Sequence, residues 1–378
     1  MSERQRVLVA MSGGVDSSVA AALLKMQGYE AIGIHMQLWD HSAKNLKKSG
    51  GSCCSVIDAE DARRVCEHLE IPFYVINARE QFEADVIDYF VHEYLQARTP
   101  NPCVMCNNKL KFSYLLKKAN DLKCEWVATG HYAKVVRVSE FQQTHLYKAT
   151  DKQKDQSYFL FGLKQPQLSR ALMPIGDLLK SNVRKLAQTF HLPVADKKDS
   201  QEICFIDEGG YKEFIEKRTT NHYRRSGPIV EQEGTMLGRH TGLYQFTIGQ
   251  RKGLGFDREE YKDHYVIGFD LNASALIVGP EKDLYKSNLI ATNCNWIGQT
   301  DFAQGLNIRA KIRSRHTEAT CKVTLLNNDS VLVEFAQPQR AITAGQAIAF
   351  YQDEQLLGGG WIETLTEPVK TKITQARF

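Results

Sequence analysis

The sequence contains no long apolar run, no internal repeat and no low-complexity tract. A membrane-spanning helix needs ~20 consecutive apolar residues, and no stretch approaches that length. No apolar core of a secretion signal follows the first residues either. We therefore expect neither a membrane protein nor a secreted one, and place the chain in the cytoplasm.

The chain also has little excess charge and no cysteine pattern typical of a disulfide framework. Its 48 Lys and Arg against 44 Asp and Glu leave a net charge of +4, which permits a polyanionic partner without requiring one. Nine cysteines, an odd number, favour a reducing compartment in which some thiols do chemistry. With 378 residues, 43% of them hydrophobic, the sequence predicts a globular protein of more than one domain.

The first 130 residues alternate between strand and helix signals. These signals predict strands over 7–10, 30–36, 73–76 and 126–131, and helices over 18–25, 58–69 and 80–97. We therefore expect an α/β fold, a parallel sheet with helices on both faces that binds ligands at the carboxyl ends of its strands. Gly14, Met36 and Gly130 lie near such ends. Gly28 is the predicted C-cap of the first helix, and Ser181 the predicted N-cap of a later one.

The character of the chain changes near residue 211. Glycines, aromatic residues and short apolar runs between 211 and 280 predict a small β-rich module. Alternating strands with Gly or Asn-Asp turns after 285 predict an antiparallel barrel. We therefore expect three domains, over 1–210, 211–284 and 285–378.

One predicted barrel strand, 308–316, is strongly basic. Arg309, Lys311, Arg313 and Arg315 occupy every second position and would share one face of a strand. Such a face fits contact with a phosphate backbone, and the alternative is a solvated barrel surface with acids nearby.

A glycine-rich loop, Ala10–Ser17, joins the first predicted strand to the first helix. Gly13 and Gly14 let backbone N–H groups approach a ligand, Ser12 and Ser17 add hydroxyl donors, and the helix N-terminus favours an anion. The loop therefore predicts a phosphate cradle, the alternative being a Gly-Gly turn without a ligand. It lacks the Gly-Lys-Ser/Thr ending of a Walker loop. Its sequence SGGVDS instead resembles the signature of the PP-loop ATP pyrophosphatase superfamily, which cleaves ATP between the α and β phosphates.

Cys103 and Cys106 form a CxxC motif directly after Pro100 and Pro102, which predict an extended segment. A lone CxxC fits a redox pair, half of a zinc site or cluster ligands. Zinc is disfavoured because no second CxxC or Cys-His pair follows at zinc-finger spacing. Lys109 and Lys111 would lower a thiol pKa where they face it, which suits a nucleophile.

Two other stretches contain cysteine. Cys204 follows Lys197 and Lys198, and alone it would be a small buried hydrophobe; together with the CxxC and the loop it is a candidate reactive thiol. Cys53 and Cys54 end a polar, basic loop over 41–55, where we expect mobility and spare thiols.

These motifs together resemble the bacterial tRNA-specific 2-thiouridylase family over essentially the whole chain. The resemblance is carried by Ala10–Ser17, Thr99–Asn107, Ala128–Tyr132, Lys154–Phe159, Lys198–Ile206, Thr247–Gly255 and Gly358–Gly360. It implies ATP- and Mg²⁺-dependent thiolation of carbon 2 of the wobble uridine in tRNAs for Lys, Glu and Gln.

The resemblance also implies roles for individual residues. It assigns ATP binding to Ala10, Met11, Ser12, Gly13, Gly14, Val15, Asp16, Ser17, Met36 and Gly130. Cys106 matches the nucleophilic cysteine and Cys204 the cysteine that carries sulfur as a persulfide. It assigns tRNA contacts to Asn101, Pro102, Cys103, His131, Lys154, Asp155, Gln156, Arg313, Ser314 and Gln346.

The implied chemistry is physically coherent. Adenylation turns the uracil oxygen into a good leaving group, and the Cys204 persulfide supplies sulfur while a Cys106–Cys204 disulfide forms. The base must leave the anticodon stack to be reached. The implied partners are tRNA and a sulfur donor, either a relay protein or a cysteine desulfurase, and we expect a monomer.

Cys103 departs from the commonest pattern of the family, which has Asp at this position as a candidate general base. The thiol opens a second mechanism, because related tRNA thiolases hold an iron–sulfur cluster with three cysteines. Cys103, Cys106 and Cys204 are the candidate ligands here.

Two other functions compete with tRNA thiolation. Another PP-loop enzyme, such as an amidating synthetase, explains SGGVDS but not the three cysteines or the basic strand. A non-catalytic tRNA-binding protein explains neither the intact loop nor the pair Cys106 and Cys204.

Overall fold

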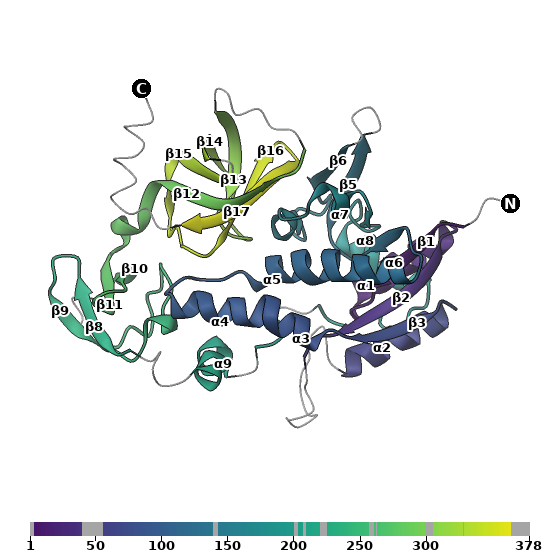
Figure 1. Cartoon of the computed structure of the whole chain (residues 1–378), viewed down its shortest axis with the longest axis horizontal. Coiled ribbons are helices and arrows are strands. Elements are labelled where there is room, and N and C mark those ends of the chain that lie inside the picture. Colours follow the sequence, from purple (N-terminus) through teal and green to yellow (C-terminus); the bar gives the residue numbers. More distant parts are fainter. Residues whose placement is uncertain are drawn as a thin grey trace.

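The structure is a computed structural model that describes residues 4–39, 56–138, 143–199, 203–206, 209–219, 225–256, 261, 263–298, 305–327 and 329–363. Its strands form a parallel sheet, a small mixed sheet and a closed barrel (Figure 1). The predicted loop over 41–55, with Cys53 and Cys54, lies outside the described residues. Within the described ranges no helix has the length and apolar character needed to cross a membrane.

The first sheet is parallel, as predicted, and consists of the four predicted strands and a fifth, β7, that was not predicted, in the order β3-β2-β1-β4-β7. The strands are β1 (Arg6–Ala10), β2 (Glu30–Gln37), β3 (Phe73–Asn77), β4 (Trp126–Ala128) and β7 (Ala171–Leu172). Strand β4 is shorter than predicted, because Thr129, Gly130 and His131 lie beyond its last paired residue. The carboxyl ends of β1, β2 and β4 therefore meet at one edge of the sheet.

Helices cover both faces of this sheet, which confirms the predicted class. Val7 and Val9 of β1 pack with α1 (Val15–Met26), α2 (Val56–His68) and α8 (Lys180–Thr189). Leu8, between them, packs on the opposite face with α6 (Leu115–Asp121). This alternation is what the two-residue period of a strand requires.

Two predicted helix caps are wrong. The C-cap of α1 is Gln27, and Gly28 is the next residue, with φ +89°. Its N–H donates to the Lys25 carbonyl and that of Tyr29 to the Leu24 carbonyl, which is a Schellman ending. Ser181 lies inside α8, which begins at Lys180. The Asp151 carboxylate accepts the Lys180 N–H at 2.8 Å, so a distant carboxylate replaces the local hydroxyl.

Two long helical stretches lead from the sheet toward the small module (Figure 1). The first runs through α3 (Arg79–Phe82), the π-helical η1 (Glu83–Ile87) and α4 (Asp88–Leu95). It buries Phe82, Val86, Phe90 and Tyr94 as their four-residue spacing predicts. The second runs through α5 (Pro102–Met105), the π-helical η2 (Cys106–Tyr114) and α6. The extended conformation predicted here ends at Asn101, because Pro102 is the first residue of a helix.

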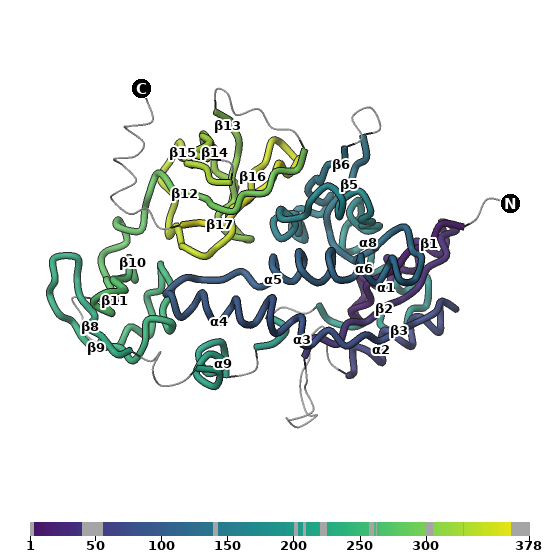
Figure 2. The backbone as a smooth tube through the Cα atoms, in the orientation of Figure 1, coloured from purple at the N-terminus to yellow at the C-terminus, as the bar shows by residue number. Residues whose placement is uncertain are grey.

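The predicted C-terminal barrel is present. Its six antiparallel strands are β12 (Tyr285–Trp296), β13 (Leu306–Lys311), β14 (Ala319–Asn327), β15 (Ser330–Arg340), β16 (Ala347–Gln352) and β17 (Gln355–Glu363). Pairing of β12 with β17 closes the barrel. A hairpin from the first half of the chain, β5 (Ala133–Val138) and β6 (Gln143–Lys148), adds to β17 (Figure 2).

The small module consists of four strands in the order β10-β11-β8-β9. They are β8 (Gly227–Glu231), β9 (Met236–His240), β10 (His264–Asp270) and β11 (Ala275–Pro280). The remaining helical segments are η4 (Ser157–Leu160), α7 (Gln165–Leu168), α9 (Gly210–Arg218), η6 (Leu243–Gln245) and η8 (Glu281–Leu284).

Candidate active site

A cavity of about 420 Å³ opens at the carboxyl edge of the parallel sheet. Its lining unites the glycine-rich loop with both predicted cysteine sites. The predicted site residues that line it are Ala10, Met11, Ser12, Gly14, Val15, Asp16, Ser17, Met36, Pro102, Cys103, Cys106, Gly130, His131, Lys154, Gln156 and Cys204. Segments almost 200 residues apart thus line one cavity.

The loop after β1 is held by its own hydroxyl groups. The Ser17 hydroxyl lies 3.2 Å from both the backbone nitrogen and the hydroxyl of Ser12, and it donates to the Gly14 carbonyl at 3.1 Å. The Ser18 hydroxyl donates to the same carbonyl at 2.8 Å. Gly14 is the N-cap of α1 and has no side chain to occupy the position in front of the helix. The space before the first turn of α1 is therefore shaped for an anion.

Two glycines allow the close approach of chain segments around the loop. Gly13 has φ +74°, and a Cβ there would lie 2.2 Å from the Asp58 carbonyl oxygen. A Cβ on Gly130 would lie 2.6 Å from the Ser17 nitrogen. Gly13 does not line the cavity, so its role in this geometry is to bring the loop against α2.

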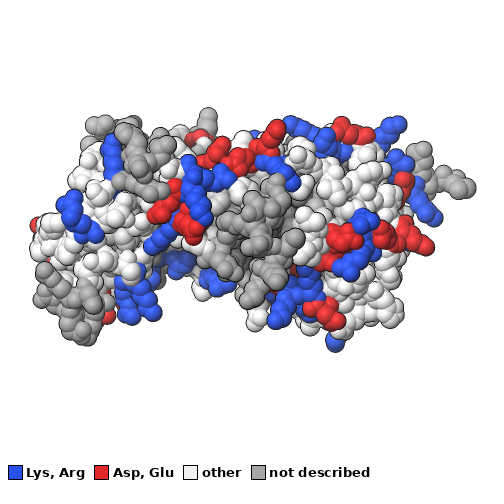
Figure 3. Space-filling model, turned by 90° about the horizontal axis from the view of Figure 1, so that it is seen from below, with Lys and Arg blue, Asp and Glu red and all other residues white. Residues whose placement is uncertain are grey.

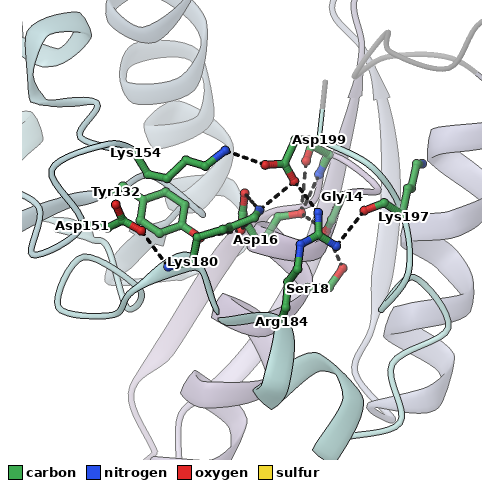
Figure 4. A network of polar contacts seen from close by, with 12 residues as sticks. Gly14, Asp16, Ser18, Tyr132, Asp151, Lys154, Lys180, Arg184, Lys197 and Asp199 are labelled. Carbon is green, nitrogen blue, oxygen red and sulfur yellow. Dashed lines mark hydrogen bonds and ion pairs between the residues drawn. The ribbon is translucent and has the colours of Figure 1, made fainter. Parts of the chain in front are cut away.

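A network of ion pairs surrounds the loop (Figure 4). Asp199 accepts contacts from Lys154 and Lys180, both at 2.8 Å, and from Arg184 at 2.9 Å. Burial opposes ionisation of Asp199, but hydrogen bonds from Lys154 and Lys180 prevail and lower its pKa to about 2. Lys180 also contacts Asp16 at 2.7 Å. Three cations thus lie close together beside the loop whose geometry suits an anion.

Lys197 joins the loop to α2. Its ammonium group donates to the Gly13 carbonyl at 3.0 Å and to the carboxylates of Asp58 and Asp61, both at 2.6 Å. Burial favours the neutral amine, yet the two carboxylates prevail and raise the pKa of Lys197. Lys197 is therefore charged. It holds the loop against α2, whereas its place in the sequence suggests a neighbour of Cys204.

The cysteine end of the cavity is built on the start of α5. Asn101 is the N-cap of this helix, and its side-chain oxygen accepts the Val104 N–H at 3.4 Å. Cys103 is exposed, Cys106 is buried and Cys204 is half-buried. Lys111 lines the cavity with Cys106, whereas Lys109 is exposed. The backbone changes to a π-helix at Cys106, a feature that is frequent at functional sites.

His131 and Asn107 are two of the buried polar side chains of the cysteine end, together with Asn101 and Thr129. His131 Nδ1 lies 2.8 Å from the Thr129 hydroxyl, and burial, with the nearby charge of Lys111, holds its pKa well below the usual value. Asn107 is 3% exposed and its amide nitrogen donates to the Phe159 carbonyl at 3.1 Å. Both groups are neutral, in contrast to the ion pairs around the loop.

Several residues predicted to contact tRNA make hydrogen bonds within the protein in this conformation. Asp155 accepts from the Ala149 backbone at 3.0 Å and from the Ser157 hydroxyl at 2.8 Å. The Gln346 amide donates to the Thr99 carbonyl at 3.2 Å and so ties the barrel to the segment before the CxxC. Neither residue lines the cavity, and nor do Asn101, Arg313 and Ser314.

The predicted row of four cations on one strand face is wrong for two of its members. Strand β13 ends at Lys311, so Arg313 and Arg315 lie in the following turn. The Arg313 guanidinium donates to the Arg340 carbonyl at 3.1 Å. On the face shown in Figure 3, basic side chains are interspersed with acidic ones, in agreement with the modest net charge.

Cys103, Cys106 and Cys204 do not form a metal site in this conformation. Among the residues that the structure describes, no group of three His, Cys, Asp or Glu side chains is arranged to hold an ion. A cluster with three cysteine ligands therefore does not fit the site as it stands, and no chemical step is routed through one.

Sequence patterns did not reveal the charged residues around the loop. Asp58 and Asp61 lie on α2, Lys180 and Arg184 on α8, and Asp199 after it. The two pairs have helical spacings of three and four residues, which is the only local signal of a shared face. Their convergence on one loop comes from the tertiary fold.

The fold and the site define a class. A glycine-rich loop between a strand and a helix of a parallel sheet, with cations around it, is a nucleotide-binding α/β domain. Residues 5–208 match the family described as tRNA methyl transferase HUP domain. Residues 212–280 match its PRC-barrel domain, and 286–362 match the aminomethyltransferase beta-barrel domain.

Whole-chain relatives identify the family. The chain is 48% identical over 363 residues to a tRNA-specific 2-thiouridylase MnmA of Geotalea uraniireducens, covering 96% of both chains. It is 46% identical over 362 residues to that of Geobacter metallireducens, covering 95% of this chain and 97% of the relative. A 4-thiouridine synthetase in complex with RNA and ATP is only distantly similar, with a TM-score of 0.34, 13% identity and coverage of 53% of this chain and 45% of that one. This chain belongs to the tRNA-specific 2-thiouridylase MnmA family.

Proposed function

We propose that the protein is a tRNA 2-thiouridylase that uses ATP to adenylate the C2 oxygen of a wobble uridine and replaces it with sulfur. The single observation that carries the proposal is the shared cavity. It is lined by the anion-shaped loop and by Cys106 and Cys204, so one bound base can meet both chemistries. Family membership, at 48% identity over 96% of the chain, supports the same reaction.

Each end of the cavity has a step to perform. The loop amides, with Ser12 and Ser17, would bind the phosphates of ATP. Asp16 and Asp199 line the cavity and would hold Mg²⁺ on those phosphates once the ion replaces their cationic partners, and the ion would neutralise charge during phosphoryl transfer. Adenylation leaves AMP on the C2 oxygen as a good leaving group and releases pyrophosphate.

The cysteines then deliver sulfur. The terminal sulfur of a Cys204 persulfide attacks C2 or is released by Cys106 as hydrosulfide. AMP departs with the oxygen, and a Cys106–Cys204 disulfide remains. An external reductant returns both thiols. The sulfur donor would be a relay protein or a cysteine desulfurase, and the substrates would be tRNAs for Lys, Glu and Gln, which bind the barrel and the segment 101–103.

Mass spectrometry of nucleosides tests the proposal. Purified protein is incubated with ATP, Mg²⁺, a persulfide donor and an unmodified tRNA for Lys. We expect 2-thiouridine together with one AMP and one pyrophosphate for each base. Thiolation without conversion of ATP to AMP would overturn the mechanism. Iron and sulfide analysis of anaerobically purified protein separately tests the cluster route.

A further inference from the structure

One polar atom in the cavity wall has no partner that explains its burial. Asn107 lines the cavity next to Cys106, and only 3% of the residue is exposed. Its Oδ1 makes no hydrogen bond with any residue that the structure describes. Leaving a buried acceptor unsatisfied is costly, so such an atom in a residue of the cavity wall points to a ligand that donates to it.

The orientation of this amide is fixed by its other end. Asn107 Nδ2 donates to the Phe159 carbonyl at 3.1 Å. Turning the amide over would place Oδ1 against that carbonyl oxygen, two acceptors facing each other. Oδ1 is therefore the end of the amide that is left without a hydrogen-bond partner among the described residues.

Two other polar side chains that line the cavity, Gln156 and His131, are already engaged. The Gln156 side-chain oxygen accepts the Tyr132 N–H at 2.9 Å. His131 Nδ1 is paired with the Thr129 hydroxyl at 2.8 Å. Asn107 Oδ1, by contrast, has an acceptor to spare, and Asn107 directly follows the cysteine that the proposed function assigns to C2 of the base.

We propose that Asn107 Oδ1 accepts the N3–H of the extruded uracil and makes the site selective for uracil over cytosine. This inference rests on the proposed 2-thiouridylase function. N3 is bonded to C2, so a group that reads N3–H belongs one residue away from the cysteine serving C2. Cytosine has a lone pair at N3, which would face Oδ1 without a hydrogen between them. A fixed hydrogen-bonding group rejects a base that leaves it unpaired.

Four proteins and two substrates test the assignment. Wild type, Asn107→Ala, Asn107→Asp and Asn108→Ala are assayed for kcat/KM of AMP formation on a tRNA for Lys with U34, and the wild type also on the same tRNA with C34. We expect Asn107→Ala to lose about 10- to 100-fold on U34, and wild type to be at least about tenfold slower on C34. Asn107→Asp keeps an acceptor, so it should remain at least about tenfold more active than Asn107→Ala.

Asn108→Ala is the matched control, because Asn108 is the next residue of the same helix and does not line the cavity. It should retain wild-type kcat/KM on U34. If Asn107→Ala and Asn107→Asp lost equal activity, the role of Asn107 would be its hydrogen bond to the Phe159 carbonyl, and the proposal would be overturned. Wild-type rates that are equal on U34 and C34 would overturn it without any variant. Absence of 2-thiouridine from wild type on U34 would instead refute the proposed function.

Discussion

The two ends of the cavity are built from different interactions. Around the loop, Lys154, Lys180 and Arg184 surround Asp199 in a network of charges. At the cysteine end two buried polar side chains, Asn107 and His131, are neutral. A polyphosphate is held by charge and by oriented amides, whereas a base is distinguished by the direction of its hydrogen bonds in a place with little water. Under the proposed function, this difference would separate activation of the base from its recognition within one cavity.

Removing either thiol should have the largest effect and should leave the loop end untouched. We expect Cys106→Ser and Cys204→Ser to lose more than about a thousandfold in thiolation, because each sulfur has a step that oxygen cannot replace. Binding of tRNA and ATP should persist, since neither thiol belongs to the ion-pair network. Mass spectrometry and filter binding measure the two properties, and thiolation by both variants would show that these cysteines are not the site.

Gly13→Ala should break the loop end alone. The new Cβ would lie 2.2 Å from the Asp58 carbonyl oxygen at a φ of +74°, so the loop must shift. A displacement of this size costs on the order of 100-fold in kcat/KM for ATP. Gly28→Ala is the control, because Gly28 has φ +89° and nothing within 4 Å of its added Cβ. It should lose about 1–2 kcal/mol of stability with normal ATP kinetics. Identical kinetics in the two variants would contradict the packing argument.

Asp199 gives a smaller effect, measured as stability against pH. Its pKa of about 2 in the folded protein lies below the value near 4 of an unfolded chain, so its ionised form stabilises the fold above about pH 4. That contribution is lost as pH falls toward 2. Urea unfolding should show wild type more stable than Asp199→Asn by about 1–2 kcal/mol at pH 5, with the gap closing at lower pH. A gap that does not change with pH would exclude this linkage.

For His131 we expect the protonation state of the ring not to change near neutral pH. Its lowered pKa keeps the imidazole neutral, so its nitrogen chemical shifts should stay those of a neutral ring from about pH 8 to 6. Because folding disfavours its protonation, any stability linked to His131 is complete above about pH 6.5 and declines below it. An imidazolium signal at pH 6 would place a charge on the buried ring that we describe as neutral.

The sequence predicted those parts of the site that follow strand ends. Ala10–Ser17, Met36 and Gly130 lie at or just beyond the carboxyl ends of β1, β2 and β4, so the topology of a parallel sheet already brings them together. The helix from Pro102 was missed because the Pro-Asn-Pro sequence also fits an extended chain, and only the cap by Asn101 decides. Asp199 and its cations come from three separate segments, so no local pattern links them.

Pairing of β6 with β17 has a practical consequence for dissecting the chain. Leu146 pairs with Leu356 and Tyr147 with Gln355, so the barrel of the last hundred residues is widened by a ribbon made far earlier. A fragment that stops after the parallel sheet would leave that ribbon without its neighbour, exposing unsatisfied backbone groups that invite self-association. Truncation at an apparent boundary would therefore yield material that precipitates, and biochemical work on this molecule calls for the intact polypeptide.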